Sequence, residues 1–237
     1  MKTLQADTDF MEGAVILIDK PVGWSSFDVV KKIRNLLRRK QGTKNIKVGH
    51  AGTLDPLATG LMILCTGKAT REIEQYQGMK KEYEAVFRLG QTTPSFDMET
   101  EVDADYPTGH ITPESILQTI DDFRGESEQV PPLFSAKRLG GKRAYEFARK
   151  GKEMSMSPVK ITIHELELIG FKDLQLSLRI LCSKGTYIRA LARDFGRALN
   201  SGAYLARLRR TAIGHFSVKD ALEPDDFEKM LNNFVTN

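Results

Sequence analysis

The run from Gly49 to Gly60, with the sequence GHAGTLDPLATG, constrains the fold of this chain more than any other feature. Its glycines permit backbone angles and close approaches that other residues resist. Pro56 pushes the residue before it, Asp55, toward an extended conformation. We therefore expect the Asp55 carboxylate to be held in one orientation, and we predict that it is functional. On residue type alone, a role as a turn or helix-cap aspartate stays open.

Apolar patterning predicts both strands and helices around this loop. The segment 61–65 (LMILC) is continuously apolar, which is typical of a strand buried on both faces, and 174–182 alternates as a half-buried strand does. Helical spacing predicts helices over 113–123 and 186–199. Because strands and helices mix without strict alternation, the sequence favours an α+β fold with a mixed sheet.

A basic helix is expected to start after Ser25 or Ser26. Apolar residues recur at helical spacing at positions 27, 30, 33, 36 and 37, and lysines and arginines occupy positions 31, 32, 34 and 38–40. A second basic segment, at about 127–152, is interleaved with aromatic residues. This composition suits nucleic acid, because cations meet phosphates and rings pack on bases. A solvated helix with its aromatic residues in the core explains the second segment equally well.

Composition and the N-terminus place the chain in a broad class. Its 237 residues include 41% hydrophobic and 28% charged residues, ordinary values for a globular protein, and its formal charge of +4 points only weakly to polyanions. No apolar run approaches the roughly 20 residues of a membrane helix. Residues 1–12 are polar and acidic, unlike a signal peptide. We expect a loose leader over 1–12, a single domain over 13–237 and a cytoplasmic location.

Neither a metal nor a cofactor is indicated by the motifs. The phosphate-binding patterns G-x-G-x-x-G and G-x-x-x-x-G-K-[ST] do not occur, and the histidines at 50, 110, 164 and 215 have no metal-ligand spacing. Cys65 and Cys182 lie in strand-like segments, where buried free thiols are expected. An aspartate without cofactor or metal can act as a base or as a nucleophile toward a sugar carbon. Arg189 is our candidate for a cationic partner that would keep Asp55 ionised.

Several motifs of this sequence resemble those of a known family. The run from Gly49 to Gly60 is similar to the signature motif of the TruB family, the bacterial tRNA pseudouridine synthases that modify the T-loop. Further motifs follow in family order over about residues 13–215. They are Asp19-Lys20-Pro21 with Gly23 and Ser25-Ser26, Lys81-Glu82-Tyr83, Val130-Pro131-Pro132 with Ser135-Ala136, Cys182 to Arg189 (CSKGTYIR), and Leu208-Arg209-Arg210.

The resemblance implies a fold and an activity. The fold is the α+β pseudouridine-synthase fold, with a large mixed, mainly antiparallel sheet flanked by helices and loops. The activity is that of an isomerase (an intramolecular transferase) that turns the uridine at tRNA nucleotide 55 from an N-glycoside into a C-glycoside without a cofactor. Asp55 is the implied catalytic residue, and it either attacks the ribose or assists proton loss from it.

The resemblance also implies how the substrate is bound. Tyr83 stacks on the target base and is placed to help the final proton removal, and Tyr187 lies against the ribose and base. Leu208 lines the pocket, and Arg189 pairs with the catalytic aspartate. His50 enters the T-loop and fills the gap that the flipped nucleotide leaves. An apolar and aromatic pocket suits a base that has left its stack.

The same resemblance bears on organisation and partners. The segment at about 127–152 coincides with the family's insertion that folds over the tRNA. Ala51 stands where many relatives carry threonine, and because the chain ends at Asn237 we expect no C-terminal RNA-binding (PUA) domain. The catalytic domain over 13–237 would then supply the affinity for tRNA. We expect a monomer that needs no membrane, guide RNA or obligate protein partner.

Two other functions are weighed against this one. A tRNA-folding chaperone of the same fold would act by binding the T-loop, and its catalysis would be dispensable. A hydrolase with His50 and Asp55 as metal ligands has less support, because no further ligands are spaced nearby.

Overall fold

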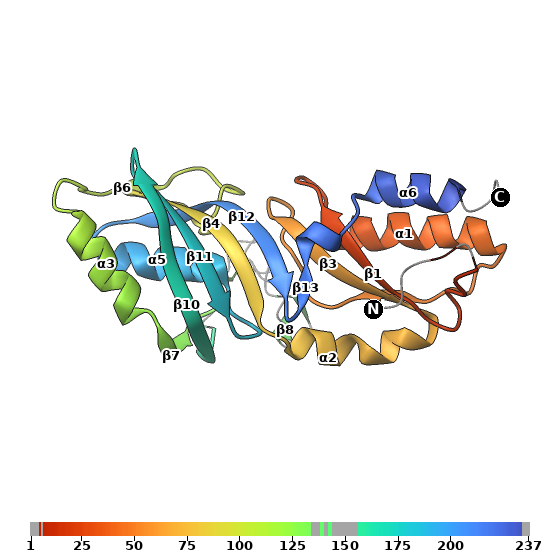
Figure 1. Ribbon diagram of the computed structural model, residues 1–237. Helices are drawn as coiled ribbons and strands as arrows, with labels where there is room; N and C mark the ends of the chain where they lie inside the picture. Colours follow the sequence, from red (N-terminus) through yellow and green to blue (C-terminus); the bar gives the residue numbers. More distant parts are fainter. Residues whose placement is uncertain (1–4, 6, 134–137, 140–141, 144–155, 234–237) are drawn as a thin grey trace. The chain divides into compact units, whose positions relative to one another are not determined.

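A computed structural model (Figure 1) describes residues 5, 7–133, 138–139, 142–143 and 156–233. The chain divides into two compact units, one formed by Met1–Tyr83 with Arg209–Asn237 and the other by Glu84–Leu208. Two long strands, β4 (Lys81–Leu89) and β12 (Ala203–Ile213), have residues in both units. None of the described helices is long and apolar enough to cross a membrane.

The first unit is built on a sheet whose middle strand is β3. This strand pairs antiparallel with β1, from Val15↔Cys65 to Lys20↔Gly60, and with β2, and it pairs parallel with β12 at Arg210↔Gly60. The elements of the unit outside β4 and β12 are β1 (Val15–Lys20), α1 (Ser26–Gln41), β2 (Val48–His50), β3 (Thr59–Thr66), η1 (Gly67–Glu72), α2 (Ile73–Gly78), β13 (Phe216–Ser217), η2 (Val218–Asp220) and α6 (Pro224–Asn233). Every residue of β3 after its first is buried, as the continuous apolar run predicts.

Helix α1 begins as the sequence predicts. Ser25 caps it in a capping box with Asp28, whose side chain accepts the Ser25 backbone N–H. Phe27, however, is 62% exposed, so its predicted place on the inward stripe is wrong. Ser26 is the buried residue of that first turn, and Val29 joins the apolar side of the helix.

The second unit contains a run of neighbouring strands in the order β12, β4, β11, β10 and β7. Its elements outside β4 and β12 are β5 (Gln91–Thr92), β6 (Ala104–Asp105), α3 (Pro113–Asp122), β7 (Gly125–Gln129), β8 (Arg138–Leu139), β9 (Lys142–Arg143), β10 (Val159–Lys172), β11 (Gln175–Cys182) and α5 (Ile188–Ala198). Strand β10 pairs antiparallel with both β11 and β7. With the parallel β3–β12 pair, this arrangement confirms the predicted α+β class and the mixed sheet.

One predicted strand starts a residue later than expected. Asp173 and Leu174 both have positive φ, 50° and 60°, so they form the tight turn between β10 and β11. Leu174 therefore belongs to the turn, and β11 begins at Gln175. Cys182 at the other end of β11 is a buried free thiol, as is Cys65 in β3, and both match the prediction.

Gly60 provides a test of how closely the strands of the first unit approach. Its φ is +107°, and a Cβ added there would lie 2.3 Å from the Arg210 carbonyl oxygen and 2.7 Å from the Arg210 nitrogen. We expect Gly60→Ala to lower the free energy of unfolding by at least about 2 kcal/mol, because backbone strain adds to a backbone clash. Urea unfolding of the two proteins measures the difference.

Gly78→Ala is the matched control, because a Cβ at Gly78 meets nothing within 4 Å. Its stability should stay within about 0.5 kcal/mol of the wild type. Equal stability of Gly60→Ala and the wild type would contradict the close approach.

Candidate active site

The predicted catalytic residue, Asp55, lies half-buried on the loop between β2 and β3. Gly52 and Gly60 on either side of it have φ values of +111° and +107°, which is the backbone freedom that the sequence predicts for this run. The residue before it is fixed as well, because the buried Ser26 Oγ accepts the Leu54 N–H at 2.8 Å and donates to the Leu54 carbonyl at 2.9 Å. The hydrogen bonds of Leu54 with Ser26 thus restrict the backbone at Asp55.

A buried lysine fixes the other side of the loop. Lys20 is fully buried, and its Nζ donates to the carbonyl oxygens of Pro21 at 3.0 Å, Trp24 at 2.6 Å and Pro56 at 3.2 Å. Burial lowers the pKa of Lys20 from 10.5 to about 8, and the negative charge of Asp55 opposes part of that change. Lys20 therefore remains largely protonated at neutral pH and places a positive charge in the field of Asp55.

Lys20 is not among the site residues that the sequence predicts. It is the last residue of β1, and its place in the Asp19-Lys20-Pro21 motif is the one sequence signal that points to it. The hydrogen bonds to Pro21 and Pro56 join two loops that are distant in the sequence. The Gly23 N–H reinforces this junction by donating to the Pro56 carbonyl at 2.9 Å.

The two arginines after Leu208 are held within the first unit. Arg210 is 1% exposed and donates to the Leu61 carbonyl at 2.7 Å and to the Gly52 carbonyl at 3.1 Å. Arg209 binds the Asp19 carboxylate through both terminal nitrogens, at 3.1 and 2.6 Å. Arg210 is thus buried inside the unit, whereas Arg209 is paired with Asp19 and its side chain stays 37% exposed.

His50, at the end of β2, has an environment that favours a neutral ring. Burial lowers its pKa from 6.5, the charge of Arg210 lowers it further, and a backbone hydrogen bond with Gly52 works in the opposite direction. Its Nδ1 is buried and has no hydrogen-bond partner among the described residues. The result is an uncharged planar group at the entrance to the Asp55 loop. Within the described part of the chain, no three His, Cys, Asp or Glu side chains gather as a metal site would require.

In the second unit, Arg189 lies at the start of α5 against a carboxylate. It is 4% exposed, its Nε lies 3.5 Å from Asp97 Oδ2, and it donates to the Ser95 carbonyl at 3.2 Å. Asp97 is itself oriented by the Ser95 hydroxyl at 2.6 Å and the Glu99 N–H at 2.9 Å. Asp97 is absent from the predicted site residues, and its turn-rich segment gives no signal of its role. The predicted pairing of Arg189 with Asp55 involves both units and stays a prediction.

The remaining predicted site residues lie in ordered elements. Tyr83 in β4 and Leu208 in β12 are each 8% exposed, and Tyr187 is the half-buried residue before α5. Strands and helix ends hold side chains more rigidly than loops do. The structure places Tyr83 in the first unit and Tyr187 and Leu208 in the second.

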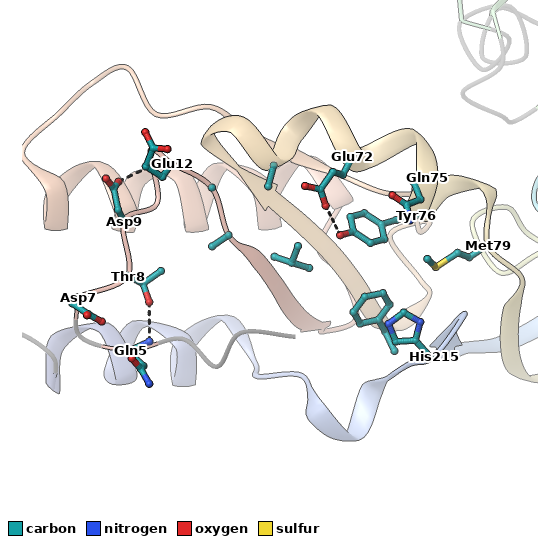
Figure 2. Close-up of a pocket in the computed structure, with 15 residues that line it drawn as sticks. Gln5, Asp7, Thr8, Asp9, Glu12, Glu72, Gln75, Tyr76, Met79 and His215 are labelled. Carbon is teal, nitrogen blue, oxygen red and sulfur yellow. Dashed lines mark hydrogen bonds between the residues drawn. The ribbon is translucent and has the colours of Figure 1, made fainter.

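The cavity in Figure 2 does not mark this site. It has a volume of about 850 Å³ and lies in the first unit, between the N-terminal segment, α2 and β13. The Tyr76 hydroxyl points to Glu72 and donates to its carboxylate at 2.8 Å, and Tyr76 packs edge-on against Phe216. None of the predicted site residues lines this cavity.

The buried ammonium of Lys20 can be tested by Lys20→Met. This change leaves three part-buried carbonyl acceptors without their donor, so we expect a loss of about 2 kcal/mol in the free energy of unfolding. The folded-state pKa of about 8 lies below the unfolded value of 10.5, so the unfolded wild type holds the extra proton between these values. The stability advantage of the wild type should therefore grow as the pH rises through this window.

Urea unfolding of both proteins at several pH values measures this advantage. Lys44→Met, at an exposed position, is the control and should match the wild type. A constant difference between the wild type and Lys20→Met at every pH would refute the buried ammonium.

Comparisons with known proteins identify the family. The sequence profile described as "TruB family pseudouridylate synthase (N terminal domain)" matches residues 38–188. The chain is 53% identical over 228 residues to tRNA pseudouridine synthase B of Bacteroides thetaiotaomicron, covering 94% of this chain and 95% of that protein. It is 51% identical over 224 residues to the protein of the same name from Flavobacterium johnsoniae, covering 94% of this chain and 98% of that protein.

Solved structures agree on the fold. A chain from the crystal structure of a Cbf5-Nop10-Gar1 complex matches with a TM-score of 0.68 and 29% identity over 90% of this chain. A chain from the structure of an H/ACA RNP bound to a substrate RNA containing 2'-deoxyuridine matches with a TM-score of 0.67 and 27% identity over 93% of this chain. This chain spans about half the length of those two, 52% and 53%. The fold that the motifs imply is confirmed, and the chain belongs to the TruB family of pseudouridylate synthases.

Proposed function

We propose that this protein is a tRNA pseudouridine synthase that isomerises the uridine at nucleotide 55 of the T-loop. One observation carries the proposal. The Asp55 loop is fixed by buried contacts, in a chain that aligns over 94% of its length with a protein named tRNA pseudouridine synthase B. A restricted carboxylate suits a reaction in which the protein itself supplies the reacting group.

The isomerisation balances without a cofactor. The bond between uracil N1 and ribose C1′ breaks, the uracil turns over, and its C5 bonds to C1′. C5 then loses its proton and N1 gains one, so no electron enters or leaves. Asp55 either attacks the ribose as a nucleophile or assists proton loss from it. Both routes need an ionised carboxylate, and the buried cation of Lys20 supports that state.

We assign substrate binding to residues of both units. Tyr83 stacks on the target base and is placed to help the final proton removal. Tyr187 lies against the ribose and base, and Leu208 lines the apolar pocket. Arg189 interacts with the catalytic aspartate, and the buried Asp97 carboxylate limits how the guanidinium can turn. His50 fills the gap in the T-loop, a role that suits its neutral ring because it must replace a stacked base.

One face of α1 has the chemistry of a phosphate-binding surface. Phe27, Lys31, Arg34 and Arg38 follow one another at helical spacing, and this set is called the α1 stripe below. Lys31 is exposed, and Arg34 and Arg38 are half-buried, with their Nε atoms covered by the protein. Other cations of the helix are already paired, because Lys32 and Arg39 both contact Glu228 of α6. The α1 stripe is therefore the part of this helix that is proposed to bind tRNA.

The predicted insertion at about 127–152 lies mostly outside the described residues. Its role as a clasp over the tRNA stays part of the proposal, with the same basic and aromatic composition in support. We propose that the two units act as one catalytic domain, as a cytoplasmic monomer without a guide RNA or an obligate protein partner.

Asp55→Asn separates the proposed enzyme from a tRNA-folding chaperone. The amide keeps the size of the side chain and removes the charge, so we expect no pseudouridine while tRNA affinity changes less than about threefold. Product formation is measured on unmodified tRNA, and affinity by filter binding. Pseudouridine formation at the wild-type rate would contradict the catalytic role of Asp55.

Salt dependence tests how the tRNA is bound. Each lysine or arginine contact with a phosphate adds about 0.7–0.9 to the slope of log affinity against log salt concentration. Replacing Lys31, Arg34 and Arg38 together by glutamine should therefore weaken binding and reduce the slope by about 2–3. The paired cations provide the control, since Lys32→Gln with Arg39→Gln should leave the slope unchanged. An affinity that hardly varies with salt would contradict the proposal.

A further inference from the structure

A buried glutamine side chain holds the backbone of Tyr187. Gln129, the last residue of β7, is 2% exposed. Its Oε1 accepts the Tyr187 N–H at 2.8 Å, and its Nε2 donates to the Tyr187 carbonyl at 3.2 Å. Both polar groups of one residue's backbone are thus bound by a single side-chain amide.

This arrangement imitates a pair of β-strands. In an antiparallel ladder, two facing residues exchange both of their N–H···O bonds, and here the carboxamide of Gln129 takes the place of the partner strand. Tyr187 has the extended backbone that such pairing needs, with φ −94° and ψ 107°. Its carbonyl also accepts the Leu191 N–H at 3.0 Å, the first hydrogen bond of α5. Gln129 therefore fixes the point at which the chain turns into the helix.

Among the residues that the structure describes, no side chain of the N-cap residue itself caps α5. The Tyr187 side chain makes no capping hydrogen bond to α5, unlike the serine and threonine that cap α1 and α3. A second contact ties the same two segments together, since Arg193 in α5 donates to the Val130 carbonyl at 3.2 Å. The Arg193 guanidinium lies over the Phe96 ring, 4.8 Å from its centre, so it is held on that side as well.

We propose that Gln129 is a positioning residue that sets the placement of Tyr187 and, two residues further, of Arg189. The inference rests on the proposed function, in which these two residues act on the substrate. Gln129 itself acts only through the Tyr187 backbone. Loss of its two hydrogen bonds would let the Tyr187 ring shift, and small shifts of groups near a reacting bond are costly to the rate.

Two substitutions of Gln129 separate positioning from general stability. Gln129→Leu introduces an apolar side chain of similar size and removes both hydrogen bonds, and we expect kcat to fall by about tenfold or more with little change in KM. Gln129→Glu makes the effect depend on pH. When protonated, the introduced carboxyl group can still accept from the Tyr187 N–H and donate to the Tyr187 carbonyl.

Ionisation of that carboxyl group removes the donor and sets a negative charge against the Tyr187 carbonyl. Burial raises the pKa of such a group, which moves its titration toward the pH range in which the enzyme can be assayed. The kcat of Gln129→Glu relative to the wild type should therefore decrease as the pH rises. The relative kcat of Gln129→Leu should stay level across the same range.

Gln118 provides the matched control, because its amide lies exposed on α3 and donates to Asp122. Gln118→Leu and Gln118→Glu should both keep the wild-type kcat at every pH. Folding of each variant is checked by thermal unfolding, and if Gln129→Leu does not fold, the pH profile of Gln129→Glu alone decides.

The inference is overturned if folded Gln129→Leu has the wild-type kcat, or if the relative kcat of Gln129→Glu does not depend on pH. The proposed function is tested separately by the wild type and Asp55→Asn. An active wild type with an inactive Asp55→Asn would leave that function in place even where the Gln129 inference fails.

Discussion

The ammonium group of Lys20, buried and bound to three backbone carbonyls, is the interaction on which the Asp55 loop most depends. A buried ammonium must have its donors satisfied, and the carbonyl oxygens of the two loops satisfy them. The positions of Trp24 and Pro56 are therefore linked, and Asp55 directly precedes Pro56. Arg210 reinforces the loop from the strand side through the Gly52 and Leu61 carbonyls.

In the second unit, buried polar side chains also fix the backbone near the proposed site. Arg189 is almost fully buried and is held by the Asp97 carboxylate and the Ser95 carbonyl, while Gln129 binds the backbone two residues earlier. Buried polar groups are costly unless they are paired, so each of these contacts selects one local geometry. In both units, the side chains proposed for catalysis and binding sit on backbone that buried polar contacts have already fixed. Such pre-organisation is what an isomerase of a flipped nucleotide requires.

Local patterns in the sequence predict much of the fold. The cap of α1 at Ser25, the buried strand at 61–65 and the φ values of Gly52 and Gly60 all follow from neighbouring residues. The long strand β10 is less evident, because its buried positions do not alternate regularly and its register with β11 shifts twice. Phe27 shows the limit of periodicity, because a helix end can turn an apolar residue outward while a serine is buried for its hydrogen bonds.

The sequence likewise predicts some residues of the candidate site and misses others. Asp55 and the aromatic residues are found from motifs, whereas the groups that hold them are not. Lys20 binds backbone carbonyls, which carry no residue-type signal, and Asp97 meets Arg189 from a distant part of the chain. Gln129 and Tyr187 are likewise joined only by the folded sheet. Contacts of this kind depend on tertiary structure and cannot be predicted from local spacing.

The most direct measurement for the account is a map of pseudouridine in the RNA of cells that lack this protein. Pseudouridine is expected to disappear from nucleotide 55 of the tRNA T-loops and to return when the wild-type gene is restored. T-loops that keep their pseudouridine in the absence of this protein would contradict it.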